Sequence, residues 1–462
     1  MVEPMSQLTI HDDRLARRMN AGDFVLAVVT ATKPDFYKQA PLVTAARERG
    51  VPSFVLHTGQ HYDDTLGHGL AEYDLEDHVA IDLGIRGGLS EKTAQVHERI
   101  GAVADRLAEW EDTTVLPIVH GDTHAAGIVP QAWLFATNRA VAHNEAGLRG
   151  MSPSFESVGD PEAFVADQWD GEWSINRAEP FPEQYDTFVG SAASVYQFAP
   201  VELNREHLER EGYPAAVDGH ERIPVVGNSV VDAIEMKRDA DLEESVFDVY
   251  PVLEERDDWI RVDVHRRANL LPNRFRAIVE GVIGLVEDGY NVNFVELTAT
   301  REALENYGYR EKLRRLDEAR ENFLFTGLWK KHAHVYEFLE SGQCLAELTD
   351  SGSMQEELNV IDEAICLTAR FNTDRPETVF DAGTNLLVPP TSGEEVTGMV
   401  EYVVETDRVR EEIQSGPTLY GEDVGESIVG FLEDRRDADP FDWAHDRVGV
   451  DAAGTDGDFE YL

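Results

Sequence analysis

The sequence is poor in basic residues, in cysteine and in long apolar runs, and each shortage excludes a class of protein. Only 40 of its 462 residues are Lys or Arg, against 89 Asp and Glu, so the formal net charge is -49. Nucleic acids and anionic membranes bind basic surfaces, and we therefore expect neither as a partner. No apolar run approaches the ~20 residues of a membrane-spanning helix, and no basic segment precedes an apolar core at the N-terminus. We expect a cytoplasmic protein.

The acidic residues are spread along the whole chain rather than gathered in a tail. At low salt this charge repels itself, whereas 1 M salt shortens the Debye length to ~3 Å. We therefore expect a halophile protein that works in molar salt. Cys344 and Cys366 are the only cysteines, and neither lies in a CxxC pattern or a Cys/His cluster. Two free thiols in a reducing compartment are expected.

Apolar strands alternate with amphipathic helices in both halves of the chain. In the first half the pattern predicts a strand over Asp23–Thr30 and a helix from about Ser90 to Glu109. In the second half it predicts a strand over Ile260–Val264 and a helix over Asn273–Glu287. Such alternation is typical of α/β proteins, and 462 residues exceed one usual core. We expect two doubly wound parallel sheets that face each other.

Composition and turn signals divide the chain into three parts. We expect an N-terminal domain over residues 1–228, with Gly227 and Asn228 as a hinge, and a C-terminal domain over 229–417. Residues 150–179 are rich in Ser, Pro, Gly, Asp and aromatics without clear periodicity. We predict that they form an inserted loop of the N-terminal domain, with a short helix near Pro161 to Asp167. Residues 418–462 are expected to form a helix that returns to the first domain, followed by an acidic tail.

Two apolar runs in the first half end in polar turns that carry a carboxylate. Val115–Val119 is followed by His120-Gly-Asp122, and Ala140–Ala142 is followed by His143-Asn-Glu145. Parallel strands deliver such side chains to the carboxyl edge of the sheet, where ligands bind. Glu183 follows in Glu179-Pro-Phe-Pro-Glu183. Three carboxylates in one crevice can differ in pKa and divide acid and base work.

Asp350-Ser-Gly-Ser353 is predicted to be a strand-to-helix turn, with the helix starting near Met354. Backbone N–H groups around Ser351 and Gly352 could bind a phosphate at the helix N-terminus, and Glu357 could bind a ribose diol. A plain capping turn uses the same residues, so both readings stay open. No Walker A pattern and no GxGxxG follows any predicted strand, which argues against an NTPase or a dinucleotide enzyme.

Basic residues stand at two further predicted turns. His265, Arg266 and Arg267 follow a strand and suit a diphosphate, although an exposed basic loop in ion pairs is the alternative. Lys33 and Lys38 lie beside a turn where Pro34 is expected to start a helix. His120 and His124 are four residues apart but not evidently on a helix, and we predict that they bind no metal.

Together, these stretches resemble the non-hydrolysing UDP-N-acetylglucosamine 2-epimerases, from about Phe24 to Leu432 and in the same order. The most specific matches are Val119-His-Gly-Asp-Thr123, His143-Asn-Glu-Ala-Gly-Leu-Arg149, Pro180-Phe-Pro-Glu183, Val226-Gly-Asn228, Val264-His-Arg-Arg267, Thr349-Asp-Ser-Gly352 with Gln355-Glu-Glu357, and Arg375-Pro-Glu377 with Ala382-Gly-Thr384.

The resemblance implies the GT-B fold, two Rossmann-like domains facing a cleft, and usually a homodimer. It implies anti elimination of UDP to 2-acetamidoglucal and re-addition, interconverting UDP-GlcNAc and UDP-ManNAc for surface-glycan synthesis, with no metal or other cofactor. It assigns catalysis to Asp122, Glu145, Glu183 and His265. The substrate-binding residues that we infer are Lys33, Lys38, Arg266, Arg267, Ser351, Gly352, Glu357, Arg370, Arg375 and Glu377.

The sequence also departs from the family. Its Gly-Thr-Arg-Pro-Glu turn is Ala31-Thr-Lys-Pro-Asp35 here, so a forked guanidinium becomes the point charge of Lys33. Pro182-Glu-Gln-Tyr-Asp-Thr187 lacks the second Glu and the Arg of the family run. Four alternatives to the leading interpretation remain: an epimerase of another UDP-2-acetamido sugar, a hydrolysing epimerase, a GT-B glycosyltransferase, and a non-catalytic UDP-sugar-binding protein.

Overall fold

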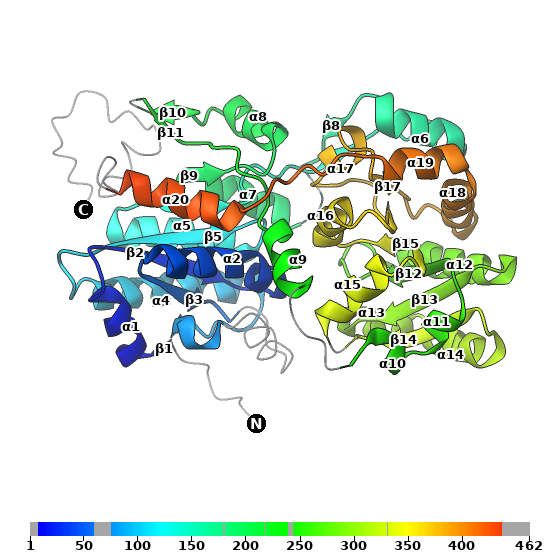
Figure 1. The fold of residues 1–462 in the computed structure, drawn as a ribbon, viewed down its shortest axis with the longest axis horizontal. Helices are drawn as coiled ribbons and strands as arrows, with labels where there is room; N and C mark the ends of the chain where they lie inside the picture. The colour runs from blue at the N-terminus through cyan, green and yellow to red at the C-terminus, as the bar shows by residue number, and fades with distance from the viewer. Residues whose placement is uncertain are drawn as a thin grey trace. The chain divides into compact units, whose positions relative to one another are not determined.

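The computed structural model describes residues 8–59, 75–177, 179, 181–217, 219–238, 244–329 and 331–436. The chain forms two compact units. Unit 1 comprises Met1–Leu148, Phe181–Ala233 and Tyr420–Leu462, and unit 2 comprises Arg149–Pro180 and Ile234–Leu419 (Figure 1). None of the helices in the described ranges is long and apolar enough to cross a membrane.

Unit 1 is built on a seven-stranded sheet that is parallel except for its first edge strand. In sheet order the strands are β1 (Thr9–Ile10), β4 (Val79–Asp82), β3 (Ser53–His57), β2 (Phe24–Thr30), β5 (Thr114–His120), β6 (Val141–Asn144) and β9 (Ser194–Phe198). All seven residues of β2 are buried, as expected for a strand covered on both faces. The predicted strand Asp23–Thr30 is therefore confirmed to within one residue.

Helices cover both faces of the first sheet. Apolar residues of α1, α4 and α5 form one core with the sheet, and those of α2 and α20 form the other. The helices of this unit are α1 (Asp12–Met19), α2 (Lys33–Arg49), α4 (Leu89–Leu107), α5 (His124–Thr137), α7 (Glu183–Ser191), α8 (Glu202–Arg210), α20 (Val424–Arg435) and the first residues of α9 (Val230–Arg238). The described part of this unit also contains the short elements η1 (Glu76–His78), β10 (Ala216–Val217) and β11 (His220–Glu221).

Unit 2 contains a six-stranded, fully parallel sheet. Its strands in sheet order are β14 (Phe323–Gly327), β13 (Asn291–Glu296), β12 (Trp259–Asp263), β15 (Cys344–Thr349), β16 (Ile365–Thr368) and β17 (Asn385–Leu387). The expectation of an α/β protein with two doubly wound parallel sheets is confirmed in its sheet architecture. Cys344 and Cys366 lie in this sheet as buried free thiols, and burial raises the pKa of both.

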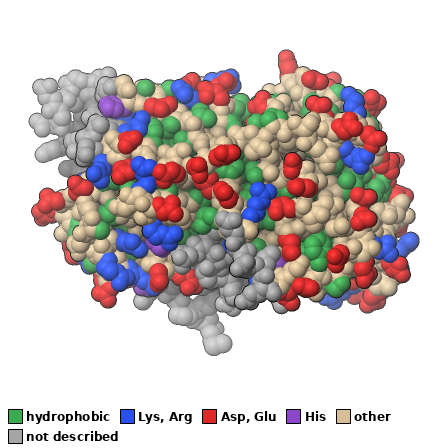
Figure 2. Space-filling model, viewed as in Figure 1, with side chains coloured by type: hydrophobic (Ala, Val, Ile, Leu, Met, Phe, Trp, Pro, Cys, Tyr) green, Lys and Arg blue, Asp and Glu red, His purple; other side chains and the backbone are tan. Residues whose placement is uncertain are grey.

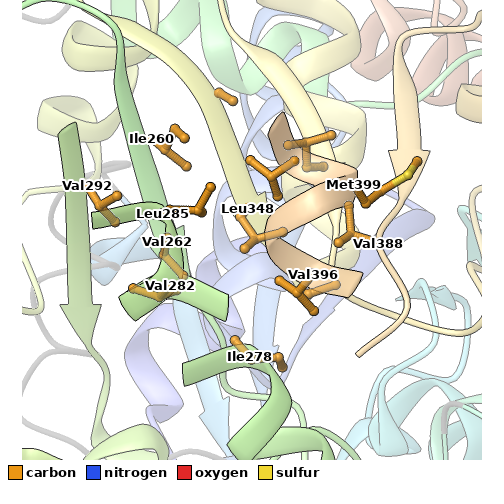
Figure 3. Packing of buried hydrophobic residues seen from close by; sticks show 14 of the residues in the cluster. Ile260, Val262, Ile278, Val282, Leu285, Val292, Leu348, Val388, Val396 and Met399 are labelled. Carbon is orange, nitrogen blue, oxygen red and sulfur yellow. The ribbon is translucent and has the colours of Figure 1, made fainter. Parts of the chain in front are cut away.

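One face of the second sheet packs against two long helices. Ile260, Val262 and Leu348 of the sheet meet Ile278 and Val282 of α12 in the core that Figure 3 shows, and α18 adds Val396 and Met399. The helices of unit 2 are α6 (Pro161–Asp170), α10 (Val246–Val249), α11 (Val252–Glu255), α12 (Pro272–Asp288), α13 (Thr298–Asn306), α14 (Arg310–Ala319), α15 (His332–Glu340), α16 (Gly352–Val360), α17 (Glu377–Phe380), α18 (Gly393–Glu405) and α19 (Asp407–Gln414). Acidic side chains are scattered over the visible face of each unit (Figure 2).

The segment 150–179, which we expected inside the N-terminal domain, instead belongs to unit 2. Its helix α6 buries Phe164 and Val165 in the core of that unit. The side-chain amide of Gln168 donates to the carbonyl of Leu387 at 3.2 Å and accepts from its N–H at 2.6 Å. This amide therefore covers backbone groups of the edge strand β17. The segment lies between Glu145 and Glu183 in the chain, and the sequence interpretation therefore placed it in the same domain as those residues. Domain membership depends on packing, and this segment packs in unit 2.

Candidate active site

Asp122 and Glu145 follow neighbouring parallel strands at the carboxyl edge of the unit 1 sheet. β5 and β6 pair with His120 opposite Asn144, so the turns that follow them are adjacent. Glu145 has a φ of 62° and Gly121 a φ of 60°, both in the left-handed region. A Cβ added at Gly121 would lie 3.7 Å from the Oε1 atom of Glu145. The backbone thus brings the Glu145 carboxylate against the turn that carries Asp122.

Two cationic groups contact the same oxygen of Glu145. Lys38 of α2 donates from Nζ to Glu145 Oε2 at 2.7 Å, and Nε2 of His120 lies 2.9 Å from the same atom. The side chains of Lys38 and Glu145 are 1% and 2% exposed. A buried carboxylate needs such partners to stay ionised. Lys38, which we predicted as a substrate contact, therefore forms a buried ion pair with a candidate catalytic carboxylate.

His120 bridges two carboxylates with its two ring nitrogens. Its Nδ1 lies 2.9 Å from Asp35 Oδ1, opposite the contact to Glu145. Burial disfavours the charged ring, but attraction to Glu145 and hydrogen bonds to Asp35 and Glu145 outweigh it and raise the pKa of His120 to about 9. Asp35, in the first turn of α2, accepts in turn from the N–H groups of Ala31 and Thr32, which directly precede the helix. His120 is consequently a buried imidazolium at neutral pH.

Glu183 is the first residue of α7. This helix packs closely on α5, the helix that follows Asp122 in the chain. A Cβ at Gly127 would lie 2.6 Å from Asp186, so only glycine permits this approach of the two helices. Asp186 also pairs with Nδ1 of His124 at 3.1 Å, and burial raises the pKa of that carboxyl. His124 pairs with a carboxylate much as His120 does. These contacts link the helix that begins at Glu183 to the turn that carries Asp122.

Lys33 stands at the first position of α2, and Pro34 follows it in the first turn, as predicted. The side chain of Lys33 lies outside the described part of the structure. Thr32 is the N-cap, and Asp35 completes a capping box with it.

In unit 2, Asp350 holds two predicted motifs together. Its carboxylate accepts from the N–H of His265 at 2.9 Å, from the N–H of Arg266 at 3.0 Å and from Asn269 Nδ2 at 3.0 Å. The strand-end loop with His265 is thereby joined to the turn that starts α16. The side chain of His265 is 43% exposed and lies 3.3 Å from Asp350 through Nδ1. Arg267 is exposed.

Two guanidinium groups meet the N-terminus of α16. Ser351 is the N-cap and Gly352 the first residue of this helix, two residues before the predicted start at Met354. A Cβ added at Gly352 would lie 2.7 Å from Arg375 Nη1 and 3.0 Å from Arg266 Nη2. Two cations at a helix N-terminus form a site suited to a diphosphate. We call Ser351, Gly352, Arg266 and Arg375 the anion site.

The arginines of the loop from Arg370 to Glu377 are held by buried acceptors. Arg375 donates from Nε to Glu356 Oε1 at 2.9 Å and pairs with Asp374 through Nη1. Arg370 donates to Asp374 Oδ1 at 3.1 Å and to Asn372 Oδ1 at 3.0 Å. Sequence reasoning assigned no role to these acceptors, because nothing in their local pattern separates Glu356 and Asp374 from the many other acidic residues, or Asn372 from an ordinary loop residue.

Glu357 and Glu377 are each 1% exposed. Glu357 lies one turn into α16, and its Oε2 is 3.8 Å from His332 Nε2. Glu377 begins α17. Neither the carboxylates of unit 1 nor those of unit 2 lie in a group of three or more His, Cys, Asp or Glu able to hold a metal ion, within the described part of the chain.

The family described as UDP-N-acetylglucosamine 2-epimerase has a sequence model that matches residues 170–433. The UDP-N-acetylglucosamine 2-epimerase of Methanocaldococcus jannaschii is 28% identical over 374 residues, 79% of this chain and 88% of that protein. The enzyme of the same name from Escherichia coli is 27% identical over 412 residues, 88% of this chain and 96% of the relative.

Among solved structures, UDP-GlcNAc 2-epimerase from Neisseria meningitidis bound to UDP-GlcNAc superimposes with a TM-score of 0.70 at 23% identity, covering 89% of this chain and 100% of that one. This likeness confirms the GT-B fold with its two Rossmann-like units. Because the family model matches more than half of the sequence, the chain belongs to the UDP-N-acetylglucosamine 2-epimerase family.

Proposed function

We propose that this protein interconverts UDP-N-acetylglucosamine and UDP-N-acetylmannosamine. Membership of the family and the names of its relatives support this activity. The observation that carries it is the environment of Glu145, a buried carboxylate with two cationic partners on one oxygen. A carboxylate kept anionic at the carboxyl edge of a sheet can stabilise a developing positive charge on a sugar ring.

The proposed reaction is an elimination followed by the reverse addition. A base removes the C2 proton, the C2–H electron pair forms the C1–C2 double bond, and the C1–O bond breaks with its electrons passing to UDP. The intermediate pair is 2-acetamidoglucal and UDP. A proton then adds to the other face of C2 as a UDP oxygen attacks C1, which gives the epimer. No electron leaves the system, so these steps need no redox cofactor.

The residues of unit 1 divide the work in this proposal. Glu145 stabilises the oxocarbenium-like state, because Lys38 and His120 hold its Oε2 and its Oε1 lies beside Gly121 in the turn that carries Asp122. Asp122 and Glu183 exchange the C2 proton. Proton transfer by positioned carboxylates accelerates such steps by about 10²- to 10⁴-fold.

The residues of unit 2 hold the nucleotide in this proposal. The anion site binds the diphosphate, and its Ser351 and Gly352 supply the helix N-terminus. His265 and Arg267 neutralise the negative charge that grows on the diphosphate. Glu357 accepts hydrogen bonds from the ribose. Arg370 and Glu377 are proposed as further contacts because they match a family motif. Lys33 is proposed as a contact because it stands where the family has an Arg and keeps the positive charge.

The test is proton NMR of UDP-GlcNAc with the protein in D2O containing molar KCl. Deuterium at C2 together with a UDP-ManNAc signal is the expected result. Free ManNAc would instead identify a hydrolysing epimerase. Unchanged UDP-GlcNAc despite UDP binding would contradict the proposed substrate, and other UDP-2-acetamido sugars would then separate a different specificity from a non-catalytic binding protein.

We further propose a homodimer that works in molar salt. The family resemblance supports the dimer, and the net charge of -49 supports the salt requirement. Light scattering in 2 M KCl should give twice the mass of the 51.6 kDa chain. A monomer under those conditions, or a melting temperature that does not rise with KCl, would contradict one of the two statements.

A further inference from the structure

The segment 149–180 connects two candidate catalytic carboxylates along the chain, yet it belongs to the other unit. It starts four residues after Glu145 and ends three residues before Glu183, both of which are in unit 1. Its described residues, 149–177 and 179, pack within unit 2. We call this segment the strap. Both of its ends are attached to one loop, the segment from Arg370 to Glu377 that supplies Arg375 to the anion site.

The first end of the strap is attached through its backbone. The N–H of Met151 donates to the carbonyl of Thr373 at 2.7 Å, and the N–H of Thr373 donates back to Met151 at 2.9 Å. Phe155 adds a ring contact to Phe371, with centroids 5.8 Å apart. Two reciprocal backbone hydrogen bonds define the distance and direction between the strap and the loop.

The second end is attached through the carboxylate of Glu179. Arg274 of α12 donates to it with both Nη atoms, at 3.0 and 2.9 Å, and Asn372 Nδ2 donates to Oε2 at 3.1 Å. The Arg274 guanidinium also lies over the ring of Phe371, 4.7 Å from its centroid. A bidentate pair of this kind restricts orientation more than a single contact does. Glu179 is therefore a junction between a long core helix and the loop.

The junction continues to the arginines of the loop. Asn372 accepts from Arg370 Nη2 at 3.0 Å through its amide oxygen, while its amide nitrogen is directed to Glu179. Arg370 Nη1 reaches Asp374, which also pairs with Arg375. A hydrogen-bonded path thus runs from Glu179 through Asn372, Arg370 and Asp374 to the Arg375 guanidinium beside Gly352.

We infer that Glu179 is a positioning residue for nucleotide binding: through Asn372 it orients Arg370 and the loop that presents Arg375 to the anion site. The inference rests on the proposed function for its substrate. It differs from a purely structural role of the strap, which would lower stability without changing affinity for UDP. Glu179 also holds the chain just before it returns to unit 1 at Phe181 and reaches Glu183.

The test variant is Glu179→Gln, because both oxygens of Glu179 only accept hydrogen bonds. A Gln amide nitrogen at either position would face a donor, Arg274 or Asn372. The matched control is Glu340→Gln, which removes another carboxylate of unit 2 from an ion pair, here with Arg238 at 2.5 Å. The side chain of Glu340 is 26% exposed and that of Glu179 is 29% exposed. Asn372→Ala interrupts the same path one step later and serves if Glu179→Gln does not fold.

The measurements are the Kd for UDP by calorimetry and KM and kcat for UDP-GlcNAc, in molar KCl. We expect Kd and KM to rise roughly 3- to 10-fold in Glu179→Gln and in Asn372→Ala. This is less than the full loss of a charge-assisted hydrogen bond to the ligand, because both residues act on UDP only through the loop. The Kd for UDP of the double variant should not exceed the higher Kd of the two single variants, because both substitutions interrupt the same hydrogen-bonded path. Glu340→Gln should match wild type.

The inference is overturned if Glu179→Gln and Asn372→Ala bind UDP like the control, or if only their melting temperatures fall. Additive effects in the double variant would also overturn it. Its failure can be told from failure of the proposed function. Wild-type protein that binds UDP without epimerising UDP-GlcNAc contradicts the function, while the UDP affinities of the variants still test the role of Glu179.

Discussion

The two candidate sites have opposite charge and are supported in the same way. At the sheet edge of unit 1 the presented group is a carboxylate, Glu145, and buried cations hold it. Beside α16 of unit 2 the presented group is a guanidinium, Arg375, and buried carboxylates of Glu356 and Asp374 hold it. In both units a functional charge is paired from within the protein, so that it stays ionised and oriented where water is excluded.

The difference between the units lies in the step that each serves. In the proposed reaction, carboxylates act on the sugar ring, where positive charge develops, and guanidinium groups act on the diphosphate, where negative charge grows. Changes in unit 1 should therefore act mainly on turnover, and changes in unit 2 mainly on binding.

The largest effect is expected for Asp122→Asn, which removes from unit 1 a carboxylate that we propose exchanges the C2 proton. We expect kcat to fall by about 10²- to 10⁴-fold, because an amide cannot take up the C2 proton. The Kd for UDP should stay within about twofold of wild type, since the anion site belongs to the other unit. Deuterium incorporation at C2 and calorimetry with UDP measure the two quantities. Normal turnover by this variant would refute the assignment of Asp122.

Lys38→Met tests whether the buried cations are needed. It removes the buried ammonium from the 2% exposed carboxylate of Glu145, while the contact of His120 with that carboxylate is kept. Breaking a buried ion pair by removing one partner costs about 3–5 kcal/mol, so the free energy of unfolding should drop by that order and kcat should fall with it. Arg315→Met is the control, because its pair with Glu311 is largely exposed, and stability should not change measurably. Equal effects of both variants in urea unfolding would contradict the prediction.

The bridging histidine predicts a pH dependence of stability. Glu145 and Asp35 raise the pKa of His120 from 6.5 to about 9 in the folded state. Lys38 contacts the same Glu145 oxygen as His120 does. A raised folded-state pKa stabilises the protein fully below about pH 6.5, and the contribution is lost as pH rises through 9. The total is on the order of 3 kcal/mol.

The corresponding experiment compares urea unfolding of wild type and His120→Gln between pH 6 and 10. The wild type should lose stability over this range, and the variant should lose less. Identical pH dependence of the two proteins would show that His120 is not the titrating group.

The smallest effect is expected for Gly352→Ala in unit 2. The new Cβ would lie 2.7 Å from Arg375 Nη1 and 3.0 Å from Arg266 Nη2, so both guanidinium groups must shift. We expect the KM and the Kd for UDP to rise roughly tenfold, with kcat changed far less. Gly398→Ala is the control within α18, where a Cβ meets nothing within 4 Å. A lower kcat with unchanged Kd would contradict the contrast between the units.

Much of the framework could be predicted from local pattern. The predicted helix Ser90–Glu109 is observed as α4 over Leu89–Leu107, and Asn273–Glu287 as α12 over Pro272–Asp288. The ordered motifs led to the family and the GT-B fold, and both are confirmed. Apolar periodicity and turn residues suffice for this, because they depend on neighbours in the chain. The roles assigned to individual site residues stay predictions.

The partners of the site residues could not be predicted in the same way. Lys38 was predicted to contact the substrate from its place beside a turn, and the structure pairs it with a carboxylate 107 positions away in the chain. In a protein with 89 acidic residues, sequence offers no means of choosing that partner. The strap was misassigned for a related reason, since its buried side chains contact strands and helices more than a hundred residues downstream.

The sequence by itself determined the order of strands and helices, the family, and the sign of the charge at each sheet edge. These depend on residue types at short spacings. Only the tertiary structure decided that Lys38 and His120 share one oxygen of Glu145, that Glu179 joins Arg274 to Asn372, and that the strap belongs to unit 2. The physical reason is that ion pairs and burial depend on distances that exist only after distant segments have packed together.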